Sequence, residues 1–286
     1  MTEPLAAPKT AGGRRWANVE FPAPLAPRPQ ISHVLFDFDG TLSLVREGWP
    51  DVMLRLFLQW IPRLPEETEV ELRQALMEDI MRLTGKPTID QMVLIAERIR
   101  ERGRQPNDPQ WYKQEFLRGL DERVDGRRAG LKNNQIPTDS LLIHQARPLL
   151  DYLSGLGLRL YLASGTDDAA LKIEAELLDL TRYFGPHIHG AHDDPTLFSK
   201  PMVIARMLQV DGISGNQLLA FGDGFAEIAA TKAVGGIAVA VASDEANNGS
   251  GRVDAWKRSR LLEVGADIVI PDYRDAIPLV DYLLGK

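Results

Sequence analysis

The chain of 286 residues contains no cysteine. This absence excludes disulfide bonds, thiolate catalysis and zinc sites built from cysteine. No apolar run approaches the ~18–20 residues that are needed to span a bilayer. An excess of positive charge is also lacking, because the formal net charge at pH 7 is −7. We therefore expect no membrane partner and no nucleic-acid partner, since the chain lacks the apolar span or the basic field that these partners require.

Residues 1–30 are rich in proline and alanine and follow neither a helical nor a strand-like period. We interpret them as a disordered leader. The pair Arg14-Arg15 is followed by Trp16-Ala17-Asn18, not by an apolar signal region. We therefore expect no export signal and a cytoplasmic protein.

An acidic motif comes directly after the first strong apolar run. Val34-Leu35-Phe36 is followed by Asp37, Asp39 and Gly40. A short apolar run that ends in polar residues and glycine is typical of a buried strand leading into a tight loop. Because parallel sheets place ligands at the carboxyl ends of their strands, we expect both aspartates to face a crevice.

The second half of the chain alternates between predicted strands and helices. Strands are expected near residues 158–163, 188–190, 218–221, 236–242 and 267–270. Helices are expected at about 167–180, 201–209, 225–234 and 273–284. This alternation indicates an α/β fold, a Rossmann-like parallel sheet with helices on both faces. We assign residues 31–44 and 145–286 to this core.

Residues 45–144 interrupt the core with helical periodicity and no convincing strand. Helices are expected at about 52–61, 66–83, 88–95 and 109–120. Together they predict an all-α domain inserted between the first and second core strands.

Four short motifs, in this order, resemble those of the haloacid dehalogenase (HAD) superfamily of phosphotransferases. They are Asp37-Phe38-Asp39-Gly40-Thr41, Ser164-Gly165-Thr166, Lys200-Pro201, and Gly222-Asp223-Gly224 with Glu227. In that family, a helical insert at residues 45–144 is a type-1 cap. The resemblance therefore implies a phosphatase with a Rossmann-like core and a helical cap.

The resemblance also implies catalytic roles for the two aspartates of the first motif. Asp37 is expected to be the nucleophile that forms an aspartyl-phosphate. Asp39 is expected to protonate the leaving alcohol and then to deprotonate water. An aspartate at the position of Asp39 marks phosphatases and mutases within the family.

Phosphate and metal binding are implied for the remaining motif residues. Phosphate binding is expected from Thr41, Ser164, Gly165 and Lys200. A Mg²⁺ site is expected from Asp37, Asp39 and Asp223, because oxygen ligands suit this ion. The family often has aspartate at the position of Glu227. We therefore leave open whether Glu227 reaches the metal or instead orients Lys200.

The stretch Thr84-Gly85-Lys86-Pro87-Thr88 falls between two predicted cap helices. Type-1 caps place a loop over the active site at this point. Thr84 and Lys86 are therefore candidates for selecting the substrate. The alternative interpretation is a solvent-exposed turn between helices.

Three functions follow from this pattern. The first is Mg²⁺-dependent hydrolysis of a small phosphorylated metabolite through an aspartyl-phosphate. The second is a phosphomutase of the β-phosphoglucomutase type, which would use the same residues. The third, from a different class, is a catalytically silent protein that binds phosphorylated metabolites, because a fold alone does not establish activity. The sequence does not indicate an oligomeric state.

Overall fold

A computed structural model of the chain describes residues 17–84, 86–192 and 198–286. Six parallel strands form one sheet in the order β3-β2-β1-β4-β5-β6. The strands are β1 (His33–Phe36), β2 (Arg159–Asp167), β3 (Ile188–Ala191), β4 (Leu218–Gly222), β5 (Ile237–Val241) and β6 (Ile268–Ile270). The predicted parallel α/β architecture is therefore confirmed.

Helices cover both faces of the sheet because successive strand residues point to opposite sides. Phe36 of β1 packs on one face, where its ring stacks on Phe221 of β4 with a centroid distance of 5.0 Å. Leu35 packs on the other face against Ile204. The first face carries α5 (Ala146–Gly155), α6 (Asp168–Leu177), α7 (Thr181–Phe184) and α11 (Ala276–Leu283). The second carries α8 (Lys200–Asp211), α9 (Phe225–Ala233) and α10 (Ala255–Glu263).

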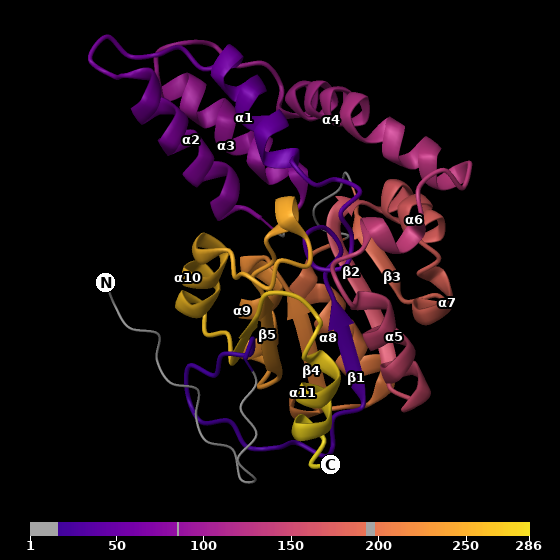
Figure 1. Ribbon diagram of the computed structural model, residues 1–286. Coiled ribbons are helices and arrows are strands. Elements are labelled where there is room, and N and C mark those ends of the chain that lie inside the picture. Colours follow the sequence, from indigo (N-terminus) through magenta and orange to yellow (C-terminus); the bar gives the residue numbers. More distant parts are fainter. Residues whose placement is uncertain (1–16, 85, 193–197) are drawn as a thin grey trace.

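Four helices between β1 and β2 form a separate layer beyond the sheet (Figure 1). They are α1 (Trp49–Trp60), α2 (Glu69–Arg82), α3 (Thr88–Glu101) and α4 (Pro109–Lys132), and we call this layer the cap. Within the described part of residues 45–144, no strand forms, in agreement with the sequence. No helix in the described ranges is long and apolar enough to cross a membrane.

The prediction of a disordered leader is wrong for residues 17–30. Val19 and Phe21 are buried, and the backbone of Glu20 pairs with Val269 through two hydrogen bonds of 2.9 Å. The physical reason is that β6 lies at the edge of the sheet, where unpaired backbone groups accept another extended segment. Residues 1–16 lie outside the described residues.

Two helices differ from the sequence-based prediction. The fourth cap helix was expected to end near residue 120, but α4 continues to Lys132. The helix α10 was not predicted. Asp254 caps it by accepting a hydrogen bond from the Lys257 N–H (2.8 Å). Lys257 is itself buried, so a charged side chain lies on the inner face and breaks the apolar pattern that identifies short helices.

The cap touches the core at a glycine. A Cβ atom added to Gly165, just inside β2, would lie 2.4 Å from the Lys86 carbonyl oxygen. Real Cβ atoms do not approach an oxygen so closely. Farther along the interface, the Arg260 guanidinium of α10 donates to the Met81 carbonyl oxygen. Gly165 therefore lets the segment after α2 lie directly on the core.

This contact generates a test. We expect Gly165→Ala to destabilise the protein by about 1–3 kcal/mol, the usual cost of overpacking. The variant should also exchange the amide hydrogens of residues 86–90 faster, because the cap segment must move away. Urea unfolding and hydrogen exchange measure both effects. The control is Gly155→Ala at the end of α5, where an added Cβ meets nothing within 4 Å. Equal behaviour of the two variants would contradict the proposed contact.

Candidate active site

Asp37 is held at the C-terminal edge of the sheet. It follows β1, and its N–H donates to the Phe221 carbonyl oxygen (3.0 Å). Its carboxylate is buried, and Oδ1 lies 2.7 Å from Nζ of Lys200. Burial raises the pKa of Asp37 well above the usual carboxyl range, against the lowering effect of Lys200. The neighbouring carboxylates of Glu227 and Asp223 raise it further. An additional cation would therefore favour the ionised carboxylate of Asp37.

Lys200 begins α8 and points into the core of the site. The Ser199 side chain caps the helix by accepting a hydrogen bond from the Met202 N–H, which places Lys200 in the first turn of α8. Nζ of the buried Lys200 also lies 2.7 Å from Oε2 of Glu227. The other Glu227 oxygen accepts from the Gly224 N–H at 2.5 Å. Glu227 thus contacts Lys200 with one oxygen and the loop after β4 with the other.

An oxygen cluster at this edge has the composition of a Mg²⁺ site. Ligand atoms of Asp37, Asp223 and Glu227 lie within 4.8 Å of one another, and all three residues are buried. Burial and, after it, the nearby carboxylates of Glu227 and Asp223 raise the pKa of Asp37 against the lowering effect of Lys200, so a cation at this cluster would stabilise the ionised carboxylate. Both Glu227 oxygens have close partners, at 2.7 and 2.5 Å, whereas the contact at Asp223 Oδ1 is a long hydrogen bond of 3.4 Å from Thr41, so Asp223 fits the ion better than Glu227 does. An oxygen-only donor set of this kind suits Mg²⁺.

Asp39 lies beside Asp37 but has different partners. The Thr166 hydroxyl donates to Oδ2 at 2.6 Å, and the Arg46 Nε lies 4.0 Å from Oδ1. Among the described residues, Oδ1 has no hydrogen-bond partner although it is buried. Burial raises the pKa of Asp39 to about 6, with Arg46 lowering it and Glu174 raising it. Asp39 therefore keeps a proton at a higher pH than an ordinary aspartate does.

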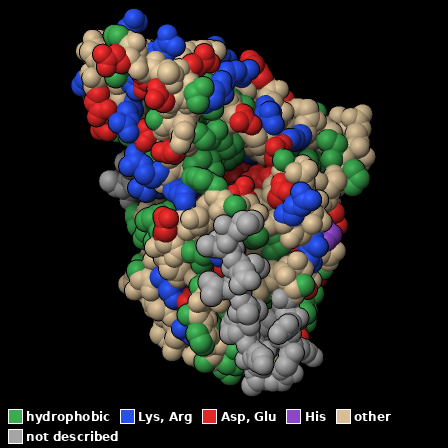
Figure 2. Space-filling view, turned by 60° about the vertical axis from the view of Figure 1, so that its left-hand side comes forward, with side chains coloured by type: hydrophobic (Ala, Val, Ile, Leu, Met, Phe, Trp, Pro, Cys, Tyr) green, Lys and Arg blue, Asp and Glu red, His purple; other side chains and the backbone are tan. Residues whose placement is uncertain are grey.

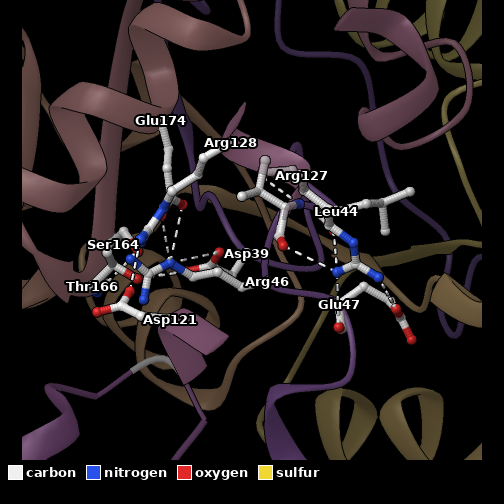
Figure 3. Close-up of polar contacts among 12 residues, drawn as sticks. Asp39, Leu44, Arg46, Glu47, Asp121, Arg127, Arg128, Ser164, Thr166 and Glu174 are labelled. Carbon is white, nitrogen blue, oxygen red and sulfur yellow. Dashed lines mark hydrogen bonds and ion pairs between the residues drawn. The ribbon is translucent and has the colours of Figure 1, made fainter. Parts of the chain in front are cut away.

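Arg46 belongs to a buried charge cluster that joins the cap to the core (Figure 3). Its Nη2 lies 2.8 Å from Oε1 of Glu174, a fully buried residue of α6. The Arg128 Nη2 of the cap helix α4 lies 2.7 Å from the same oxygen. The charge on Glu174 is therefore shared between a guanidinium of the cap and one of the segment that leads into it.

Asp223 follows β4 and has a partner on each oxygen. Thr41 donates to Oδ1 at 3.4 Å, and Lys257 Nζ lies 2.9 Å from Oδ2. The Thr41 hydroxyl thus faces Asp223, and Thr41 is not among the described residues that line the cavity. Its phosphate-binding role stays a prediction.

A cavity of about 70 Å³ lies between the cap and the core. Figure 2 shows the surface hollowed there, with acidic side chains inside the hollow. The core contributes Asp37, Asp39, Ser164, Gly165, Thr166 and Asp223 to its lining. The carboxylates and the Ser164-Gly165 pair predicted from the sequence are therefore brought together, and Lys200 lies behind Asp37.

The cap side of the cavity mixes polar and apolar side chains. Its lining residues are Trp49, Leu83, Thr84, Lys86, Thr88, Gln91, Phe116 and Leu120. Thr84 Oγ1 is buried and has no hydrogen-bond partner in the described part of the chain. Lys86 is exposed but reaches the rim. Both cap residues named from the sequence thus lie at the cavity.

Sequence reasoning missed Arg46, Glu174 and Lys257. Arg46 follows the acidic loop closely, and this proximity was the available signal for it. Glu174 and Lys257 lie on helices far along the chain from Asp37. The charged residues near them in the sequence are typical of solvent-exposed helix faces. Their burial is visible only once the helices are packed.

The first comparison with known proteins gives a match over most of the chain. The family model described as haloacid dehalogenase-like hydrolase matches residues 31–235. No protein of the curated set matches.

Solved structures share the fold at low sequence identity. A predicted phosphoglycolate phosphatase from Haemophilus somnus is 15% identical, with a TM-score of 0.59, over 87% of this chain and 98% of that one. A HAD family hydrolase from Deinococcus radiodurans, with bound phosphate and sodium, is 19% identical, with a TM-score of 0.54, over 89% and 98%. A provisionally assigned β-phosphoglucomutase from Thermotoga maritima is 17% identical, with a TM-score of 0.52, over 88% and 99%. Together with the family match over residues 31–235, the buried acidic site at the sheet edge identifies this chain as a member of the haloacid dehalogenase-like hydrolases.

Proposed function

We propose that the protein is a Mg²⁺-dependent phosphatase of a small phosphorylated metabolite. The observation that carries this proposal is the pairing of Asp37 with Lys200 at 2.7 Å beside Asp39, whose buried Oδ1 lacks a hydrogen-bond partner among the described residues. A nucleophile and an acid–base group thus line one cavity. The family membership supports hydrolysis as the reaction class.

The reaction begins when an Asp37 carboxylate oxygen attacks phosphorus and the bond to the substrate alcohol breaks. Asp39 gives its proton to the departing oxygen. Asp39 then takes a proton from water, which attacks the aspartyl-phosphate and releases inorganic phosphate and free Asp37. Two like unit charges ~4 Å apart repel by roughly 4 kcal/mol at an effective dielectric constant near 20. Lys200 reduces this repulsion because its ammonium lies against the attacking group.

Asp37, Asp223 and the backbone carbonyl of Asp39 would hold the metal ion. When bound, Mg²⁺ supplies positive charge to the phosphate oxygens. The Ser164 hydroxyl and the Gly165 N–H are the candidates for holding further phosphate oxygens, because both residues line the cavity.

The size and lining of the cavity favour a small substrate with polar groups. Its volume is about 70 Å³, and Thr84 Oγ1 has no partner in the described ranges. A glycolate-type or sugar phosphate fits this description, and one similar structure is a predicted phosphoglycolate phosphatase.

A phosphomutase is the second candidate. The cap lies against the core at Gly165, and a mutase requires a cap that keeps water away from the site. Measurement of isomer formation against phosphate release separates the two functions.

Asp37→Asn tests the nucleophile. We expect turnover of the best substrate in a panel of phosphorylated metabolites to fall by at least ~10³-fold, because the amide is a poor nucleophile. Phosphate release measures the loss. The matched control is Asp51→Asn on the exposed start of α1, which should keep full activity. Activity of Asp37→Asn without deamidation would contradict the proposed role of Asp37.

Removal of the metal tests the Mg²⁺ dependence. EDTA should abolish the activity of the native protein, and added Mg²⁺ should restore it. Full activity in EDTA would contradict the proposed metal site.

The proton on Asp39 predicts a pH profile. If its protonated form is required, kcat/KM falls as pH rises through the Asp39 pKa, which is about 6 in the free protein. Arg46 lowers this pKa, so Arg46→Met should raise it and move the falling limb to higher pH. The control is Arg127→Met, which removes a guanidinium bound to the carbonyls of Leu44, Val45 and Glu47 instead. A shift to lower pH, or the same shift in both variants, would contradict this role of Arg46.

Lys86→Ala tests substrate selection by the cap. Lys86 lies on the cap side of the cavity, whereas Lys200 contacts the nucleophile. We therefore expect kcat/KM to fall for the best metabolite and to change little for p-nitrophenyl phosphate, whose leaving group offers few polar contacts. Equal losses on both substrates would place Lys86 in phosphate binding or folding, and no loss on either would make it a plain surface residue.

A further inference from the structure

A second buried lysine lies behind the proposed metal site. Lys257 of α10 is 6% exposed, and its Nζ contacts oxygens of three residues. They are Asp223 Oδ2 at 2.9 Å, Glu245 Oε1 at 2.6 Å and Ser243 Oγ at 3.0 Å. A buried ammonium with this number of oxygen partners is held in one place, because breaking the contact to either carboxylate leaves a buried charge without its partner.

The same unit contacts the loop that follows the nucleophile. The Ser243 hydroxyl accepts from Lys257 and donates to the Gly40 carbonyl oxygen at 2.7 Å. A Cβ added to Gly40 would lie 2.2 Å from Asp223 Oδ2 and 2.8 Å from Glu245 Oε1. Space around Asp223 Oδ2 is therefore already filled, and this oxygen cannot turn toward another ligand without breaking the packing.

Lys257 acts through Asp223 and not on the substrate. Asp223 lines the cavity, whereas Lys257 is not among the described lining residues. With Oδ2 held by the ammonium, Oδ1 is the Asp223 oxygen that remains for an ion. Thr41 donates a long hydrogen bond of 3.4 Å to this oxygen.

We propose that Lys257 is a positioning residue that restricts Asp223 to one metal-binding oxygen and so makes the site select Mg²⁺ over Ca²⁺. This inference rests on the proposed function, because it takes Asp223 as a metal ligand. Mg²⁺ demands near-ideal octahedral geometry, whereas Ca²⁺ accepts more ligands and bidentate carboxylates. Denying the second oxygen of Asp223 therefore disfavours the larger ion.

Glu245 has a separate part in this arrangement. A fixed ammonium next to Asp223 repels any cation that binds there. Glu245 Oε1 lies 2.6 Å from Lys257 Nζ, so its carboxylate offsets that charge. Glu245 should therefore set the affinity for both ions alike, whereas Lys257 sets the preference between them.

The test measures the binding of MgCl₂ and of CaCl₂ to the full chain by calorimetry, without substrate. We expect Lys257→Met to reduce the ratio of Mg²⁺ to Ca²⁺ affinity by roughly tenfold, the lower end of typical effects for residues that orient a ligand. Glu245→Gln should weaken both ions by roughly tenfold at an unchanged ratio. The matched control is Lys232→Met on the neighbouring helix α9, which removes the ion pair of Lys232 with Asp267 and should leave both affinities unchanged.

A second variant guards against misfolding of Lys257→Met. Lys257→Ala leaves room for an added amine, and ethylammonium should restore the Mg²⁺ preference if position and donor are what matter. An unchanged ratio in the Lys257 variants, or a lack of rescue by the amine, would overturn the inference. Failure of the native protein to bind Mg²⁺ at all would instead overturn the metal site of the proposed function, so the two failures are distinguishable.

Discussion

Four carboxylates at one edge of a parallel sheet, three of them buried, are the constraint on which the rest of this structure depends. Asp37, Asp39, Asp223 and Glu227 follow strands that meet at the same edge. Buried charges of one sign are tolerated only when cations lie against them, and removal of one partner costs about 3–5 kcal/mol. The cations come from separate elements, Lys200 from α8 and Lys257 from α10. Both helices must therefore pack correctly for the acidic edge to be stable.

The cap is tied to this edge through charge as well as through backbone contact. Arg46 lies on the segment that leads into the cap, and Glu174 joins it to Arg128 of α4. Arg127, the neighbouring residue, donates to three backbone carbonyls of the same segment. A movement of the cap would therefore displace Arg46, which lies 4.0 Å from Asp39. The position of the cap and the environment of Asp39 are thus physically coupled.

The core of the fold could be predicted because its signals are local. Most strands of the sheet contain a short apolar run next to turn residues, and alternation with helices indicates a parallel sheet. The errors occurred where distant contacts overrule local composition. Residues 17–30 look like a leader by composition, but Glu20 pairs with the exposed edge at Val269. The helix α10 lacks a clear apolar face because Lys257 is buried there.

The sequence by itself determined which residues are the candidates for the proposed chemistry. Asp37, Asp39, Asp223 and Lys200 stand beside strand ends or helix starts, where a few neighbouring residues suffice to place them. Only the tertiary structure decided their partners. Glu227 contacts Lys200, and Lys257 holds Asp223, although neither pair is close in the chain. The reason is that an ion pair inside a protein depends on how separate helices pack on the sheet, and no local pattern in the sequence encodes that distance.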